Sequence, residues 1–224
     1  MSKKLVIFDF DGVIADSEKI WIKNRQNELN KRYNLGWDFE TVNKHIGGMS
    51  DKSKRETLDK LGIKTNDEFW KNITNIDLKY MEEIGLDVFD GVTDILDNID
   101  NYCIATGGVL EKTLKKLKVI NMWEKYFNED NLFTVDMVKK GKPEPDLFLY
   151  AAEKMGYNPK DCVVIEDSIV GLMAGLNAGM EVIAFLGSEI YQNDKYLRKV
   201  KDLGIKNIFY NMKDVKEFLI KKVN

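Results

Sequence analysis

Two aspartates end the first apolar run of the chain, which starts at Leu5, and a glycine follows them. Asp9 and Asp11 are two positions apart, so in extended backbone they face the same side while Phe10 faces the other. Two carboxylates at the end of a buried strand need compensation, because an unpaired buried charge is very costly. A divalent cation would supply it. A strand that simply ends in a polar Asp-Gly turn explains the motif alone about equally well.

Two further groups follow later apolar runs. Thr106 and Gly107 come after Tyr102–Ala105 and precede a helical pattern. A hydroxyl and backbone N–H groups at a helix start can hold an oxyanion or phosphate, although Thr106 could equally be an ordinary helix N-cap. Lys142 stands before Pro143, and a proline-fixed backbone could aim its ammonium inward. A surface lysine beside a turn is the simpler alternative.

A second acidic pair, Glu166 and Asp167, ends the apolar run Cys162–Ile165. Small residues repeat at helical spacing just beyond it, at Gly171, Ala174, Gly175 and Ala178. Glycine inside a helix costs about 0.5–1 kcal/mol relative to alanine, so this pattern indicates close packing of the helix against a sheet. The packing explains the small residues but not the two acids.

The elements that must position these groups form an alternating pattern of short apolar runs and helices. The predicted strands are Leu5–Phe10, Tyr102–Ala105, Leu132–Val135, Cys162–Ile165, Glu181–Phe185 and Ile208–Tyr210. Nearly continuous apolar strands that alternate with helices predict an α/β fold, a parallel sheet with helices on both faces. The carboxyl ends of such strands meet at one edge. Asp9/Asp11, Thr106, Lys142 and Glu166/Asp167 are therefore predicted to converge there.

Residues 16–86 break the alternation, because they carry helix signals and no strand-forming run. A long helical insertion after the first strand predicts a separate small domain. We therefore expect a core of residues 1–15 and 87–224 with a helical domain of residues 16–86, able to close over the strand ends.

Composition excludes several functions. The 224 residues carry 34 basic and 37 acidic side chains, a net charge of -3, and their mixing argues against a nucleic-acid-binding face. The Lys-rich segment Lys112–Lys118 is expected to be a solvated helix face. No apolar stretch reaches the roughly 20 residues that span a bilayer, so we expect a cytoplasmic protein with no membrane partner. Cys103 and Cys162 lie in apolar runs, as small hydrophobes do.

Taken together, the motifs resemble the haloacid dehalogenase-like superfamily, and within it the magnesium-dependent phosphatases and phosphosugar mutases. The matching pieces are Asp9-Phe10-Asp11-Gly12, Thr106, Lys142-Pro143 and Glu166-Asp167-Ser168, which occur in the family's order. The resemblance covers essentially the whole chain. It implies a Rossmann-like core and identifies residues 16–86 with the family's small helical cap.

The resemblance also implies a role for each residue. Asp9 would attack phosphorus and form an aspartyl-phosphate, and Asp11 would act as acid and then as base. Mg²⁺ would be held by Asp9, Asp167 and the Asp11 backbone carbonyl, with Glu166 supporting this shell. Thr106 and the Gly107 N–H would hold phosphoryl oxygens, and Lys142 would offset negative charge.

The cap is expected to set specificity. In its segment 45–52, Gly48 and Lys52 are predicted to contact substrate, as is Glu18 in the first cap helix, although a helix-to-helix turn with Ser50 as N-cap explains the segment equally well. We expect a monomeric phosphatase for a small phosphorylated metabolite, of the sugar phosphate or phosphoglycolate type.

Two alternatives stay open. One is a phosphosugar mutase of the β-phosphoglucomutase type, whose relatives carry a histidine in the first cap helix. Trp21 lies near that place here, and the only histidine is His45, so the departure weakens this alternative. The other is a switch protein, either receiver-like or one that binds a phospho-ligand without turnover. The chain's D-x-D at the first strand and its late acidic pair differ from the usual receiver arrangement.

Overall fold

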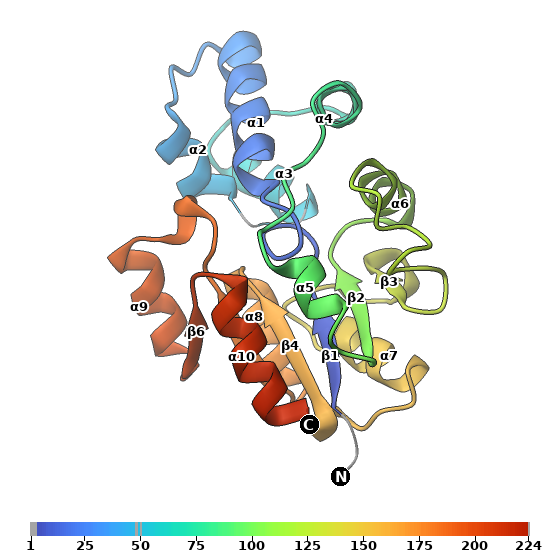
Figure 1. Ribbon diagram of the computed structural model, residues 1–224. Coiled ribbons are helices and arrows are strands. Elements are labelled where there is room, and N and C mark those ends of the chain that lie inside the picture. The colour runs from blue at the N-terminus through green and yellow to red at the C-terminus, as the bar shows by residue number, and fades with distance from the viewer. Residues whose placement is uncertain (1–3, 48, 50, 224) are drawn as a thin grey trace. The chain divides into compact units, whose positions relative to one another are not determined.

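A six-stranded parallel sheet organises the larger part of the chain in the computed structural model, which describes residues 4–47, 49 and 51–223 (Figure 1). Its strands are β1 (Leu5–Phe8), β2 (Tyr102–Thr106), β3 (Leu132–Thr134), β4 (Cys162–Glu166), β5 (Glu181–Phe185) and β6 (Asn207–Phe209). They lie in the order β3-β2-β1-β4-β5-β6 and pair in parallel throughout. The predicted α/β fold is confirmed, and each predicted run contains or overlaps a strand.

Helices and short 3₁₀ turns connect the strands. The helices are α5 (Val92–Leu96), α6 (Leu110–Val119), α7 (Asp146–Lys154), α8 (Ile169–Asn177), α9 (Asp194–Asp202) and α10 (Met212–Val223). The 3₁₀ turns are η1 (Val135–Met137), η2 (Pro159–Asp161) and η3 (Glu189–Tyr191). Because β1 lies between β2 and β4, the segments that follow these three strands are neighbours at one edge of the sheet.

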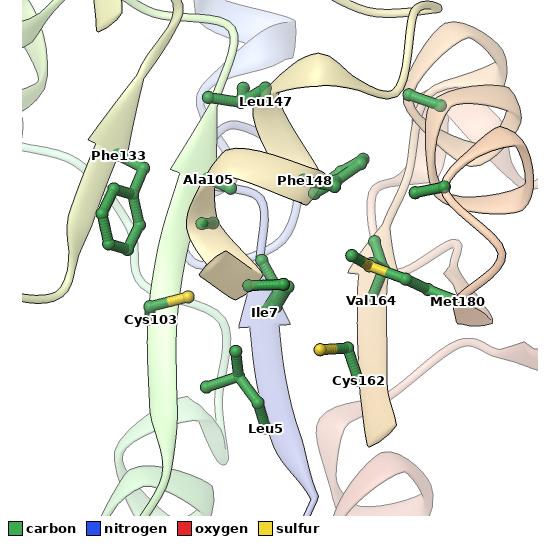
Figure 2. Packing of buried hydrophobic residues seen from close by; sticks show 14 residues of the cluster. Leu5, Ile7, Cys103, Ala105, Phe133, Leu147, Phe148, Cys162, Val164 and Met180 are labelled. Carbon is green, nitrogen blue, oxygen red and sulfur yellow. The ribbon is translucent and has the colours of Figure 1, made fainter. Parts of the chain in front are cut away.

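One face of the sheet packs against α7 and α8 in a continuous apolar core (Figure 2). Leu5 and Ile7 of β1 point into it together with Cys103 of β2, while Leu147 and Phe148 enter from α7. These residues alternate along each strand, as the two-residue period of extended backbone requires. Both cysteines are free and buried, as expected for small hydrophobes.

The predicted small-residue pattern of α8 serves close packing. A Cβ on Gly175 would lie 2.8 Å from Cγ2 of Val182 and 3.5 Å from Val164, so α8 approaches β4 and β5 closely there. Alanine at 174 and at 178 is buried as well. The close approach holds the start of α8 near the end of β4.

The chain divides into two compact units, Met1–Asp16 with Asp87–Asn224, and Ser17–Leu86. The second unit contains α1 (Glu18–Tyr33), α2 (Phe39–Ile46), α3 (Asp51–Lys60) and α4 (Asp67–Glu83), with no strand among its described residues. Asp38 and Asn66 cap α2 and α4 through their side chains, and a buried pair of Arg25 with Asp77 links α1 to α4. Within the described ranges, no helix is both long and apolar enough to cross a membrane.

Candidate active site

The loop after β1 places both aspartates of the first motif at the edge of the sheet. The N–H of Asp9 donates to the Ile165 carbonyl at 3.0 Å, which continues the pairing of β1 with β4 by one residue. The Phe10 carbonyl then accepts from the N–H groups of Val13, Ile14 and Ala15 and closes a tight turn. Gly12 has φ +82°, and a Cβ there would overlap the Asp167 carboxylate, so the turn requires glycine for its conformation and for space.

The end of β4 is held just as firmly. The N–H and hydroxyl of Ser168 donate to Oε2 of Glu166 at 2.7 and 3.0 Å, and Ser168 also caps α8 by accepting from the Gly171 N–H. A Cβ on Gly171 would overlap the Glu166 carboxylate. From α9, the Tyr196 hydroxyl donates to the Asp167 carbonyl at 2.7 Å. These contacts fix the second acidic pair next to the first.

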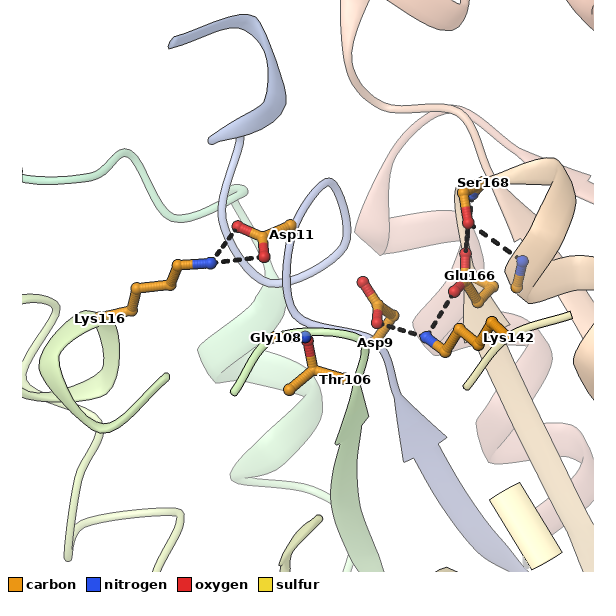
Figure 3. A network of polar contacts seen from close by, with 9 residues as sticks. Asp9, Asp11, Thr106, Gly108, Lys116, Lys142, Glu166 and Ser168 are labelled. Atoms are coloured by element: carbon orange, nitrogen blue, oxygen red, sulfur yellow. Dashed lines mark hydrogen bonds and ion pairs between the residues drawn. The ribbon is translucent and has the colours of Figure 1, made fainter. Parts of the chain in front are cut away.

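Three carboxylates and one ammonium form the centre of the site (Figure 3). Asp9, Glu166 and Asp167 are all buried, and each offers an oxygen within 4.8 Å of those of the other two. Lys142 Nζ donates to Asp9 Oδ1 at 2.5 Å and to Glu166 Oε1 at 2.7 Å. One ammonium against three carboxylates leaves an excess negative charge in a buried place, and a divalent cation on oxygen ligands would balance it.

For both Asp9 and Lys142, burial and the opposite charge of the partner shift the pKa in opposite directions. Burial raises the pKa of the Asp9 carboxyl above its usual range, and Lys142 counteracts that rise. Burial alone would lower the pKa of Lys142, but Asp9 and Glu166 outweigh it and raise that pKa. The lysine is therefore a fixed positive charge, and added positive charge would further favour ionised Asp9.

Thr106 lies at the end of β2 and is almost fully buried, with its Oγ1 accepting from the Gly108 N–H at 3.1 Å. It does not cap α6, whose N-cap is Val109. Gly107 is exposed, and a Cβ there would meet nothing within 4 Å. The backbone after β2 is thus open to a ligand, as the oxyanion hypothesis for this segment requires.

Asp11 stands apart from the acidic group and pairs with a lysine that sequence reasoning missed. Lys116 Nζ lies 2.7 Å from Oδ1 and 2.5 Å from Oδ2 of Asp11, as Figure 3 shows. The prediction that Lys112–Lys118 is a solvated helix face is wrong at Lys116, which is buried on α6. The buried residues Thr113, Lys116 and Leu117 follow helical spacing, and Leu117 was the apolar residue that marked this buried face in the sequence.

Residues 6–185, from β1 to the end of β5, match the family model described as haloacid dehalogenase-like hydrolase. The chain belongs to this family. The match spans both structural units and every strand-end residue described above, and the resemblance predicted from the motifs is confirmed.

Relatives and solved structures of this family match most of the chain. A phosphorylated carbohydrates phosphatase of Thermotoga maritima is 30% identical over 80% of this chain and 82% of its own length. A β-phosphoglucomutase of Bacillus subtilis is 27% identical over 90% of this chain and 92% of its own. The crystal structure of a conserved haloacid dehalogenase-like protein of unknown function from Agrobacterium tumefaciens superposes with a TM-score of 0.84 at 23% identity, covering both chains fully.

The structure brings residues of the haloacid dehalogenase-like motifs together at one edge of the sheet. Asp9, Lys142 and Glu166 are in direct contact, and Thr106 ends the neighbouring strand β2. Glu18 and Lys52 belong to the second unit, where Glu18 is buried on α1 and Lys52 is exposed on α3. Gly48 and Ser50 lie outside the described residues.

Proposed function

We propose that this protein is a magnesium-dependent phosphatase that hydrolyses a small phosphorylated metabolite, of the sugar phosphate or phosphoglycolate type. We further propose that it acts as a monomer in the cytoplasm. The observation that carries the proposal is the pairing of Asp9 with Lys142 beside a buried acidic group, in a member of a hydrolase family. Asp9 is thereby fixed, desolvated and adjacent to positive charge, which suits a carboxylate nucleophile.

The reaction divides into two in-line displacements. In the first, an oxygen of Asp9 forms a bond to phosphorus while the bond to the leaving oxygen breaks, and Asp11 gives that oxygen a proton. In the second, water attacks the aspartyl-phosphate, its proton passes to Asp11, and Asp9 leaves as the free carboxylate. Catalysis of phosphoryl transfer rests mainly on positioning and charge neutralisation, and in this proposal the residues at the strand ends supply both.

The acidic group fits a magnesium ion. Asp9 and Asp167 would hold it together with the Asp11 backbone carbonyl, because oxygen ligands are those that Mg²⁺ prefers. Both Glu166 oxygens already accept hydrogen bonds, from Lys142 and Ser168, which favours a supporting role for this residue. When bound, the ion would neutralise negative charge on the phosphoryl group and on the nucleophile.

Phosphoryl oxygens would be held opposite the acids. Thr106 ends β2, the neighbour of β1, and Gly107 comes directly after it. Donors such as the Thr106 hydroxyl and the Gly107 N–H, aimed at developing negative charge, stabilise a transition state. Lys142 would add a positive charge that stays in place through both displacements. We propose residues 16–86 as the cap, with Gly48, Lys52 and Glu18 as candidate contacts to the rest of the substrate.

One relative is a β-phosphoglucomutase, so a mutase reaction is the second candidate function. His45, the only histidine of the chain, stacks on Trp37 with ring centroids 5.0 Å apart, and Trp21 in the first helix is buried. The described helix α1 carries no histidine, and a mutase of this type would use one there. This difference favours hydrolysis over isomerisation. Incubation with a glucose phosphate and a bisphosphate activator should release inorganic phosphate, whereas isomerised sugar without free phosphate would favour the mutase.

A panel of phosphorylated metabolites tests the proposal and narrows the substrate. We expect phosphate release from p-nitrophenyl phosphate and more efficient release from some sugar or short-chain acid phosphates, all dependent on Mg²⁺ and abolished by EDTA. Binding of these esters without turnover would favour the phospho-ligand-binding alternative. Unchanged rates in EDTA would contradict the metal dependence.

A further inference from the structure

Asp9 and Asp11 each form an ion pair with a different lysine. Lys142 binds Asp9 and Glu166, whereas Lys116 binds Asp11 through both carboxylate oxygens. The two ion pairs point in different directions from the same loop, as Figure 3 shows. Asp11 is therefore not a member of the buried acidic group but belongs to a separate contact with α6.

The side chain of Lys116 is buried, and its ammonium contacts both Asp11 and the Phe10 ring. Its side chain is only 9% exposed, and its ammonium lies 5.2 Å from the centroid of the Phe10 ring. The neighbouring Leu117 is fully buried, which fixes the rotation of α6. The N-terminus of the helix is anchored as well, since the Leu110 N–H donates to Asp136. A buried lysine on a fixed helix presents its charge at one defined point.

We propose that Lys116 is a positioning residue, which holds the Asp11 carboxylate in the orientation that its acid/base role requires. This inference rests on the proposed function, in which Asp11 exchanges a proton with the leaving oxygen and then with water. The Asp11 side chain is 24% exposed, so its carboxylate has room to change orientation when the contact with Lys116 is lost. Two hydrogen bonds from one ammonium select a single orientation.

The contact with Lys116 still allows proton transfer. A carboxylate offers about four acceptor sites on its two oxygens, and the two bonds from Lys116 occupy one on each. In the acid step one oxygen carries the proton that passes to the leaving oxygen, and in the base step it accepts the proton of water, while the other oxygen can stay bound to Lys116. Loss of this orientation should slow the chemical steps more than substrate binding, because misplacement of a reacting group by a small distance already costs rate.

A double-mutant cycle separates action through Asp11 from any other role. We would compare wild type, K116M, K116R, D11N and D11N/K116M on p-nitrophenyl phosphate and on glycerol phosphate, with Mg²⁺ saturating. K118M is the matched control, because Lys118 is exposed on the same helix. Circular dichroism and thermal unfolding would check folding, and K116Q would replace K116M if K116M does not fold.

We expect K116M to lower kcat on glycerol phosphate about ten-fold, within the range of couplings between contacting residues, with KM little changed. The loss should be smaller on p-nitrophenyl phosphate, whose leaving group needs less protonation. K116R should recover part of the rate, K118M should match wild type, and K116M should change nothing in the D11N background.

Two results would overturn the inference. A kcat of K116M equal to that of wild type would show that the ion pair does not set the orientation of Asp11. An equal loss from K116M in the wild-type and D11N backgrounds would mean that Lys116 acts independently of Asp11. Failure of the proposed acid/base role looks different, because D11N itself would then keep full activity on glycerol phosphate.

Discussion

Asp9 and Asp11 are two residues apart, yet their carboxylates have different surroundings. Asp9 is buried among two acids and one lysine, whereas Asp11 is partly exposed and bound by Lys116. A buried carboxylate next to fixed positive charge suits attack on phosphorus, and a more accessible one suits proton exchange with water and a leaving group. The difference in environment favours assigning them different roles.

The accessible aspartate should matter most when the leaving group is poor. We expect D11N to lower kcat/KM on alkyl phosphates by about 10²–10⁴-fold, the usual contribution of a general acid or base. The loss on p-nitrophenyl phosphate should be smaller, since nitrophenolate leaves with little protonation. Steady-state kinetics on both esters measure the ratio, and an equal loss on the two would contradict a role as general acid.

Removal of the central ammonium should destabilise the fold as well as the reaction. We expect K142M to lower the free energy of unfolding by about 3–5 kcal/mol, because loss of one partner leaves buried carboxylates uncompensated. Mg²⁺ should restore more stability to K142M than it adds to wild type. Urea unfolding with and without Mg²⁺ measures both effects. K140M, at an exposed lysine of the same loop, should unfold like wild type in both conditions.

At the residue scale, the sequence predicted the acids and Thr106 because each ends an apolar run, and Lys142 because a proline follows it. Lys116 was missed because a run of lysines dominated the interpretation of its helix, although Leu117 beside it marks a buried face. The ion pair of Lys116 with Asp11 joins residues far apart in the chain, and only the packing of α6 beside the sheet brings them together. Sequence spacing alone carries no information on that contact.

At the element scale, two glycines let carboxylates approach backbone that other residues would block. Gly12 makes room for the Asp167 carboxylate, and Gly171 makes room for that of Glu166. The small-residue pattern of α8 predicted close packing against a sheet, and Gly175 fits that prediction. The same pattern did not predict that Gly171 serves the acidic pair instead, because that depends on how the side chain of Glu166 folds back over the start of α8.

Gly171 and Gly175, the two glycines of α8, give a matched pair of variants. Both G171A and G175A should lose about 1–3 kcal/mol of stability from overpacking, since each new Cβ meets a fixed neighbour. Only G171A displaces the Glu166 carboxylate, so only G171A should also weaken the activation by Mg²⁺ and lower kcat. Magnesium titrations of activity at a temperature where both variants are folded would show this, and equal Mg²⁺ dependence of the two would count against it.

At the scale of the whole molecule, the site is a set of loops at one edge of a sheet whose core is apolar and continuous. The chain divides into two compact units, Met1–Asp16 with Asp87–Asn224, and Ser17–Leu86. What the sequence could not provide is the substrate, because a helix-to-helix turn explains the segment of Gly48 and Lys52 equally well, and Glu18 carries no motif of its own. The strand-end motifs each have a structural explanation alone, but their occurrence at four strand ends of one sheet does not.

An ion bound by the acidic group should stabilise the folded molecule. At about 100 times its dissociation constant, Mg²⁺ should add about 2.7 kcal/mol to the stability of the free enzyme. For a chain of this size, that corresponds to a rise in Tm of about 5–10 °C. Differential scanning fluorimetry with Mg²⁺ or EDTA measures the shift. D167N should lose most of it, while D202N, at an exposed position on α9, should keep it.

The covalent intermediate on Asp9 is the central claim of the mechanism, and trapping it tests that claim most directly. D11N should slow hydrolysis of the intermediate, so acid quenching of D11N during turnover of p-nitrophenyl phosphate with Mg²⁺ should preserve it for peptide mass spectrometry. We predict one phosphoryl group on the peptide that contains Asp9, and none in D9N. A phosphoryl group on any other residue, or turnover by D9N at the wild-type rate, would contradict the mechanism.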